Sequence, residues 1–236
     1  MRAAIDLLAQ SVVTFQGQSY SFTRFYETFI DRQFADAYLQ ALVASVSVKQ
    51  DAPRLQAATA RQIVQWLQQQ DFYRKEQLES RWLLIFCLYW WSSFAIGYAF
   101  EEEIFRDLRA KKIKFFAHDI TIRNERLSPF DLTVLNLRGD VKYSAWFLTR
   151  EDARLEGLDF FITRLYDESG VGWLRVVLLT PAARELIGEE TNPARLVLKF
   201  SDNEIAAKLG LSLTHYDDWK VRVRSKQIVE GDSTDE

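Results

Sequence analysis

The fold is decided by residues 97–142, which read GYAFEEEIFRDLRAKKIKFFAHDITIRNERLSPFDLTVLNLRGDVK. The first third of this stretch has apolar residues at helical spacing, and the last third alternates as paired strands do. A helix followed by a hairpin of strands is typical of the α+β class, and we predict a mixed central sheet flanked by helices. Acidic residues and a lysine recur along the stretch, so the faces they occupy determine what it can bind.

The predicted helix at about 93–110 carries one glutamate on its apolar stripe. Glu101 lies four residues after Gly97 and shares its face with apolar residues. Glu102 and Glu103 point away from this face and are predicted to be solvated. A buried carboxylate is costly unless it is paired or binds a metal, so Glu101 either has such a partner or reaches water at the end of the stripe.

A hairpin is predicted for the sequence LSPFDLTVLNLRGDVKYSAWF, with Arg138-Gly139 in its turn. Asp140 and Lys142 are two residues apart and therefore share one face of the second strand. If the connecting loop has an even number of residues, Asp131 on the first strand points to that same face. Two acids and a lysine would then converge on one side of the sheet.

The residues before this stretch are predicted to be mainly helical. Residues 12–23 form either a short hairpin around Gln16-Gly17 or a loop that follows a helix. Aromatic residues at helical spacing between 22 and 42 predict one or two helices with a buried aromatic face, and another helix is predicted after Pro53. We divide the chain into a helical region at 1–91, a core at 92–230 and an acidic tail at 231–236.

Further strands and a short helix are predicted after the hairpin. Two strands are expected at about 158–167 and 171–179, and Pro181 opens a short helix. A strand RLVLKF and a short helix NEIAAKLGL are expected after Pro193. The mixture of elements again indicates the α+β class.

Residues 82–100, WLLIFCLYWWSSFAIGYAF, carry no charge and as one helix would span about 28 Å, nearly the core of a bilayer. Aromatic residues in the middle of the run and basic residues near both ends argue against a membrane span. Ser92 and Ser93 interrupt the run, and either could cap a new helix. We therefore predict two buried helices that meet at these serines, with a membrane anchor as the alternative.

The composition predicts a cytoplasmic protein with a substantial core. Hydrophobic residues make up 48% of the 236, enough to bury one large domain or two small ones. A net charge of -3 gives no overall attraction to nucleic acid, so a DNA contact needs a local basic patch. A lone cysteine, Cys87, excludes an intramolecular disulfide, the N-terminus predicts no signal peptide, and His118 and His215 have no zinc-binding spacing.

The order of a helix glutamate, a strand, an aspartate and an acid-x-lysine resembles the PD-(D/E)XK nuclease superfamily, over roughly residues 93–180. A glycine four residues before the glutamate is common in that family, and Gly97 and Glu101 match it. The family's Pro-Asp appears as Pro129-Phe130-Asp131, with one residue inserted, and its acid-x-lysine as Asp140-Val141-Lys142. The resemblance implies a restriction-endonuclease-like core on which the N-terminal helical region packs.

The resemblance also implies hydrolysis of DNA by a Mg²⁺-dependent nuclease, with Mn²⁺ as a substitute ion. Asp131 and Asp140, helped by Glu101, would be ligands of Mg²⁺, which prefers oxygen donors. Lys142 would hold the attacking water or stabilise charge on the phosphate. Phosphate contacts would come from the basic residues that flank the motif, namely Arg106, Arg109, Lys111, Lys112, Arg123, Arg126 and Arg138.

Other interpretations stay open at this point. The two aspartates and the lysine could form an ordinary cross-strand charge cluster on a solvated face. The protein could also keep a nuclease fold without activity and bind nucleic acid or a protein partner. The helical region at 1–91 could supply support, specificity or homodimerisation.

Overall fold

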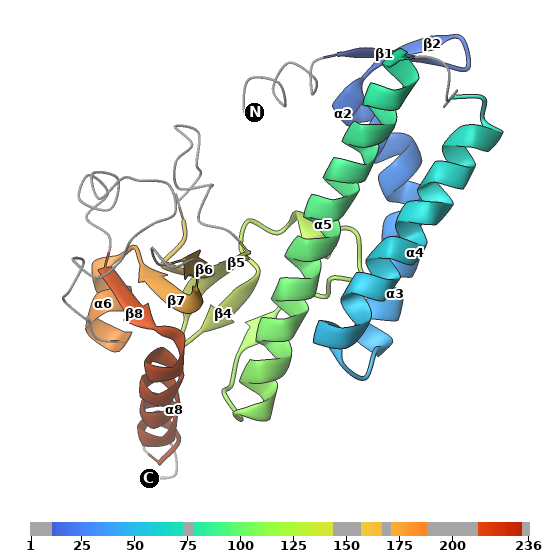
Figure 1. The fold of residues 1–236 in the computed structure, drawn as a ribbon. Helices are drawn as coiled ribbons and strands as arrows, with labels where there is room; N and C mark the ends of the chain where they lie inside the picture. The colour runs from blue at the N-terminus through green and yellow to red at the C-terminus, as the bar shows by residue number, and fades with distance from the viewer. Residues whose placement is uncertain (1–10, 73–77, 144–156, 167–170, 188–211, 233–236) are drawn as a thin grey trace. The chain divides into compact units, whose positions relative to one another are not determined.

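The structure, a computed structural model, describes residues 11–72, 78–143, 157–166, 171–187 and 212–232. The chain divides into two compact units, which are Met1–Ala99 with Ile120–Arg123, and Phe100–Asp119 with Asn124–Glu236. Helices dominate the first unit, and a mixed six-stranded sheet lies in the second (Figure 1). The predicted α+β class with an N-terminal helical region is confirmed.

The first unit begins with a hairpin of β1 (Val12–Phe15) and β2 (Gln18–Ser21), joined by Gln16-Gly17 as one of the two predictions had it. Helical elements follow in the order α2 (Phe22–Phe25), the π-helix η1 (Tyr26–Asp31), α3 (Arg32–Ala44), α4 (Val48–Gln69) and α5 (Leu78–Ala110). The residues of α5 from Phe100 on belong to the second unit. Pro53 lies inside α4, so this helix starts earlier than predicted.

Aromatic side chains form the core of the first unit, as the sequence predicts. Phe22 and Phe25 are fully buried. The ring of Phe15, from β1, packs against that of Phe25 with centroids 5.5 Å apart. The buried Tyr38 hydroxyl donates a hydrogen bond of 2.9 Å to the carbonyl of Ala95, which ties α3 to α5. The aromatic stripe is therefore used for packing.

The predicted break at Ser92 and Ser93 is wrong, because α5 is one continuous helix. Neither serine begins a new helix. The Ser92 hydroxyl instead accepts a 2.9 Å hydrogen bond from the Gln56 side chain, and the Trp91 indole donates one of 3.0 Å to the Gln56 carbonyl. The Ser92 hydroxyl therefore bonds to a side chain of α4 and does not cap a helix. The backbone of α5 continues through residue 92 without a break.

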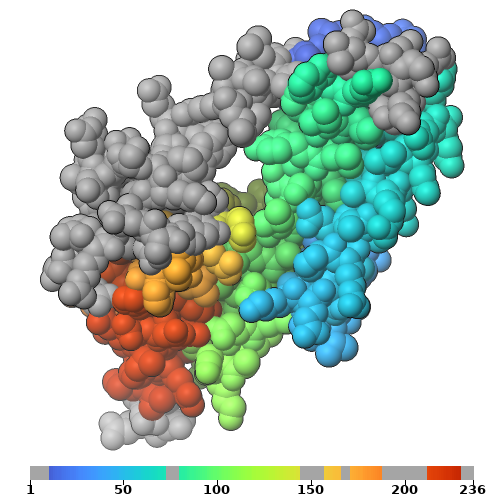
Figure 2. All heavy atoms as spheres, in the orientation of Figure 1, coloured from blue at the N-terminus to red at the C-terminus, as the bar shows by residue number. Residues whose placement is uncertain are grey.

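One side of α5 is apolar and exposed. The helix between Ser80 and Ala110 is long and apolar enough to cross a membrane, and 22% of its most apolar 18-residue window is buried. Trp82, Ile85 and Tyr89 lie on the exposed side, and Figure 2 shows this part of α5 at the molecular surface beside α4. The helix is therefore buried along one side only, in contrast to the two buried helices predicted.

The second unit contains one mixed sheet whose strands follow the chain order β3-β4-β5-β6-β7-β8. The strands are β3 (Phe116–Ala117), β4 (Leu132–Val134), β5 (Leu137–Lys142), β6 (Phe160–Tyr166), β7 (Gly172–Leu178) and β8 (Ser212–His215). β5 and β6 pair in parallel, and the other neighbours are antiparallel. The helices α6 (Pro181–Ile187) and α8 (Tyr216–Asp232) pack against β7 (Figure 1).

Several predictions downstream of the hairpin are confirmed. β6 and β7 lie within the two predicted strands, and α6 starts at Pro181. The predicted strand RLVLKF and helix NEIAAKLGL lie outside the described residues. β8 was not predicted, and α8 continues to Asp232, which the sequence placed in the acidic tail. The rest of that tail lies outside the described residues.

Candidate metal centre

The hairpin β4–β5 turns three residues earlier than predicted, at Leu135-Asn136. Both loop residues have positive φ, 51° and 61°, as a two-residue type I′ turn requires. Gly139 lies within β5, where an added Cβ would overlap the ring of Phe160 on the neighbouring strand β6. The glycine was therefore misread as a turn signal, because its actual role is to make room for that ring.

The two-residue loop fulfils the even-number condition that brings Asp131 to the side of Asp140. Asp131 lies one residue before β4, and its backbone amide donates to the Gly139 carbonyl at 2.9 Å. The Val141 amide donates to both carboxyl groups, at 2.7 Å to Asp131 Oδ2 and at 3.0 Å to Asp140 Oδ1. One backbone N–H thus fixes the two acids next to each other.

Lys142 completes the group on the hairpin. Its Nζ lies 2.6 Å from Asp140 Oδ1 and 4.0 Å from Asp131 Oδ2. Both aspartates are buried, whereas the lysine side chain is 43% exposed and so remains open to a ligand from solvent. The acid-x-lysine spacing places both side chains on one face of β5, as predicted.

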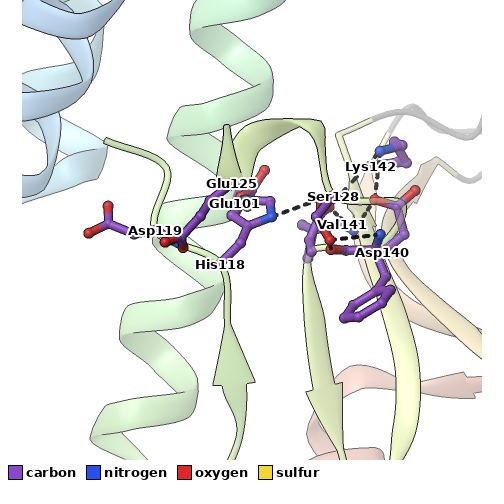
Figure 3. A network of polar contacts seen from close by, with 10 residues as sticks. Glu101, His118, Asp119, Glu125, Ser128, Asp140, Val141 and Lys142 are labelled. Atoms are coloured by element: carbon purple, nitrogen blue, oxygen red, sulfur yellow. Dashed lines mark hydrogen bonds and ion pairs between the residues drawn. The ribbon is translucent and has the colours of Figure 1, made fainter. Parts of the chain in front are cut away.

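Two further side chains reach the same place from other elements. Glu101, on α5, is buried, and its Oε1 lies 2.6 Å from Nε2 of His118. His118 follows β3 directly, and its amide donates to the Asp131 carbonyl at 3.2 Å. Three potential ligand atoms lie within 4.8 Å of one another, and they come one each from Glu101, His118 and Asp131. Figure 3 shows Glu101 and His118 on one side of the group, with Asp140 and Lys142 on the other.

Burial of these carboxyl groups opposes their ionisation. Burial raises the pKa of Asp131 well above its ordinary value, and its hydrogen bond with Asp140 and the charges of Glu101 and Asp140 raise it further. Burial also raises the pKa of Glu101, against the opposing hydrogen bond and charge of His118. The site therefore favours a proton, or a bound cation, over three bare carboxylates.

Asp140 and Lys142 have the opposite tendency, towards their charged forms. Burial alone would raise the pKa of Asp140, but the hydrogen bond from Asp131 and the charge of Lys142 outweigh it and lower that pKa. Burial would lower the pKa of Lys142, but the charges of Asp131 and Asp140 outweigh it and raise that pKa. The pair is thus an ion pair beside a carboxyl group that favours its protonated form.

The donor set fits a divalent cation. Buried, adjacent carboxylates are the usual oxygen ligands of Mg²⁺, and Asp131, Asp140 and Glu101 can supply them. The positive charge of an ion would oppose the burial and the neighbouring negative charges that raise the pKa of Asp131. His118 adds a nitrogen donor that the sequence did not predict.

Glu102 corrects one prediction about the three consecutive glutamates. It is buried, not solvated, and its Oε1 accepts a 2.8 Å hydrogen bond from Arg106 Nε. Arg109 lies 3.7 Å from the same oxygen. The two arginines lie four and seven residues later on the same helix and compensate the buried charge.

The seven basic residues proposed for phosphate contacts lie in different surroundings. Arg123 belongs to the first unit, where it pairs with Asp31 at 3.0 Å. Arg138 is exposed, and its guanidinium lies 5.5 Å from the centroid of the Phe130 ring. Lys111 and Lys112 are exposed at the end of α5. Arg126, like Arg106, is half-buried.

Packing does not account for Gly97, and the sequence pattern did not predict His118 as a site residue. An added Cβ at Gly97 would meet open space among the described residues, so packing there does not explain the family-like glycine. His118 was dismissed because two histidines do not make a zinc pattern. The signal that could have indicated it was its position in sequence between Glu101 and Asp131.

No family model, curated protein or solved structure matches the chain. Its function is therefore inferred from the side chains of the site.

Proposed function

We propose that the protein is a metal-dependent nuclease that hydrolyses phosphodiester bonds of DNA at the site of Glu101, Asp131, Asp140 and Lys142. The observation that supports this most is the pair of buried aspartates fixed by the Val141 amide, with Lys142 at 2.6 Å from one of them. The residue types and their order also resemble the PD-(D/E)XK superfamily.

The aspartates have the role of ligands. Asp131 and Asp140 would hold a divalent cation, Mg²⁺ or Mn²⁺, and Glu101 lies close enough to help them. When bound, the ion supplies Lewis-acid chemistry at the scissile phosphate. The Val141 N–H keeps both carboxylates aligned, so their positions do not have to be organised when the substrate binds.

Lys142 acts as a donor and not as a general base, because the charges of Asp131 and Asp140 raise its pKa and keep it protonated. Its ammonium group would donate hydrogen bonds to the attacking water or to a phosphate oxygen. The water oxygen forms a new bond to phosphorus and gives a proton to solvent, the bond to the leaving sugar oxygen breaks, and that oxygen takes a proton from solvent.

Phosphates flanking the cut would contact exposed basic side chains. Lys111, Lys112 and Arg138 meet this requirement best, because each has an exposed side chain. Arg106 is partly occupied by its ion pair with Glu102. The local basic residues would offset the net negative charge of the chain.

The test is incubation of the purified full chain with plasmid, linear and branched DNA, with Mg²⁺, with Mn²⁺ and with a chelator. We expect cleavage only with metal, and its loss in Asp140→Asn and Lys142→Gln. The matched controls are Asp217→Asn and Lys49→Gln, since both side chains are exposed and lie outside the site. Absence of cleavage on every DNA, or equal cleavage by the site variants and the controls, overturns the proposal.

A further inference from the structure

We propose that His118 is a metal ligand through Nδ1, which makes this a site for a first-row transition metal ion such as Mn²⁺ rather than for Mg²⁺ alone. The inference rests on the proposed function, because it assigns the ion that the same site takes. It concerns a residue outside the acid-and-lysine motif. Three observations support it, and they concern the two ring nitrogens separately.

The first observation is the contact of Nε2. This nitrogen lies 2.6 Å from Glu101 Oε1, and both side chains are 93% buried. A carboxylate acceptor at this distance favours the tautomer that carries its proton on Nε2. The other ring nitrogen, Nδ1, then presents its lone pair. Histidines that bind metals commonly donate their second N–H to a carboxylate in this way, which fixes the orientation of the ring.

The second observation is that Nδ1 is buried and makes no hydrogen bond with any residue that the structure describes. A buried polar atom without a partner is destabilising, so a ligand at this position would remove that cost. The ring cannot turn to avoid it without breaking the Glu101 contact. His118 is thus held with its free nitrogen in the interior of the site.

The third observation is the distance between Nδ1 and the carboxyl group of Asp131. It lies 3.9 Å from Asp131 Oδ1, which is too far for a hydrogen bond. Two donors that share one ion, each about 2.1 Å from it, are separated by at most roughly 4.2 Å. The distance between these two atoms is therefore compatible with one shared ion. The Asp131 carboxyl group in turn contacts Asp140, so the nitrogen donor joins the proposed acidic ligands.

A nitrogen donor changes which ion the site prefers. Mg²⁺ is held by oxygen ligands and waters, whereas imidazole suits transition metals. In this arrangement Glu101 is mainly a positioning residue, because its Oε1 is engaged with His118. We therefore expect Mn²⁺ to bind more tightly than Mg²⁺, and His118 to account for the difference.

The experiment uses Mn²⁺ as the probe and measures its ligands directly. The full chain is loaded with Mn²⁺, and electron spin-echo envelope modulation detects ¹⁴N coupling from a coordinated imidazole. His118→Gln retains a side-chain N–H near the position of Nε2 but has no donor in place of Nδ1. His215→Gln is the matched control, because the chain has only two histidines and His215 contacts Arg175.

We expect ¹⁴N coupling in the original chain and in His215→Gln, and none in His118→Gln. Mn²⁺ affinity should fall at least about tenfold in His118→Gln, with a smaller change for Mg²⁺. If His118→Gln does not fold, the coupling in His215→Gln still identifies the ligand, since one histidine remains. Bound Mn²⁺ without ¹⁴N coupling, coupling that persists in His118→Gln, or no bound Mn²⁺ overturns the inference.

DNA cleavage is scored separately. Cleavage by a protein whose Mn²⁺ shows no nitrogen coupling retains the proposed function and removes His118 as a ligand. Nitrogen-coupled Mn²⁺ in a protein that cleaves no DNA retains the ligand and removes the nuclease.

Discussion

The hairpins β1–β2 and β4–β5 have the same construction and carry different chemistry. Each has a two-residue loop with positive φ at both positions, Gln16-Gly17 in one and Leu135-Asn136 in the other. Four residues back from the first loop, Val12 pairs with Ser21. The same count in the second hairpin reaches Asp131 and Asp140.

The comparison shows that hairpin geometry brings paired positions of two strands together but does not determine their chemistry. Val12 and Ser21 are exposed and neutral, so their proximity has little consequence. Asp131 and Asp140 are adjacent buried carboxyl groups, and two negative charges there would be destabilising without compensation. In the second hairpin, the arrangement that can bind a cation therefore lowers the stability of the metal-free protein.

The largest expected effect is on activity. Asp140→Asn removes one proposed ligand and the ion-pair partner of Lys142, so we expect DNA cleavage to fall by about 10³-fold or more. Ser21→Asn, at the equivalent position of the first hairpin, should leave the rate unchanged. Initial rates on one DNA substrate at saturating Mn²⁺ test this comparison, and equal losses in the two variants would contradict it.

The next effect is on stability and concerns the two glycines of the hairpins. Gly139→Ala places a Cβ against the buried Phe160 ring, and we expect it to cost about 3 kcal/mol of unfolding free energy. Gly17→Ala meets open space and suffers only from φ +76°, with a cost of about 1 kcal/mol. Urea denaturation measures both. Phe160→Leu should reduce the destabilisation caused by Gly139→Ala and leave that caused by Gly17→Ala unchanged.

A smaller effect depends on pH in the metal-free protein. The pKa of Asp131 is raised above its ordinary value of 3.8, so the folded chain binds this proton more tightly than the unfolded chain does. Its contribution to stability is therefore present at low pH and is lost as pH rises from about that value through the folded pKa. An asparagine at position 131 does not ionise, so its contribution does not depend on pH in this way. We expect Asp131→Asn to be more stable than the original chain by a margin that grows towards neutral pH.

Thermal unfolding at several pH values checks this margin. A constant difference between the two proteins would contradict the assigned shift. Addition of Mn²⁺ should stabilise the original chain more than Asp131→Asn and so reverse the order.

The smallest effect comes from exchanging the loop residues. Asn136→Gly relieves a positive φ at an exposed position and should stabilise the chain by somewhat less than about 1 kcal/mol. Gly17→Asn should destabilise it by a similar amount. Opposite signs in urea denaturation support the equivalence of the two loops, and equal signs would contradict it.

The sequence predicted much of the fold because helix and strand periodicity depends on local residues. β6 and β7 follow directly from alternation and turn composition, and the hairpin around Gln16-Gly17 was one of the two predictions for residues 12–23. The turn of β4–β5 could not be found in this way, because Leu135 disfavours positive φ, while Gly139 is a glycine for a reason located on another strand. Tertiary packing overrode the local signal at both positions.

The candidate site shows a similar division. Spacing within one strand predicted that Asp140 and Lys142 share a face, and a correct condition on loop length predicted Asp131 beside them. Two features required knowledge of tertiary packing. Glu102 is buried although it lies off the predicted apolar face, and His118, directly after β3, reaches the acids from another element. Histidine spacing alone cannot reveal a mixed group contributed by a helix, a strand end and a hairpin.

The amide of Val141 gives the site a spectroscopic reporter. Its single N–H donates hydrogen bonds to two carboxyl groups that differ in their tendency to ionise. Any change in their charge, whether from a proton or a diamagnetic ion, alters the electric field along this N–H bond. The nitrogen and proton chemical shifts of one backbone amide therefore follow the occupancy of the site without a substrate or a mutation.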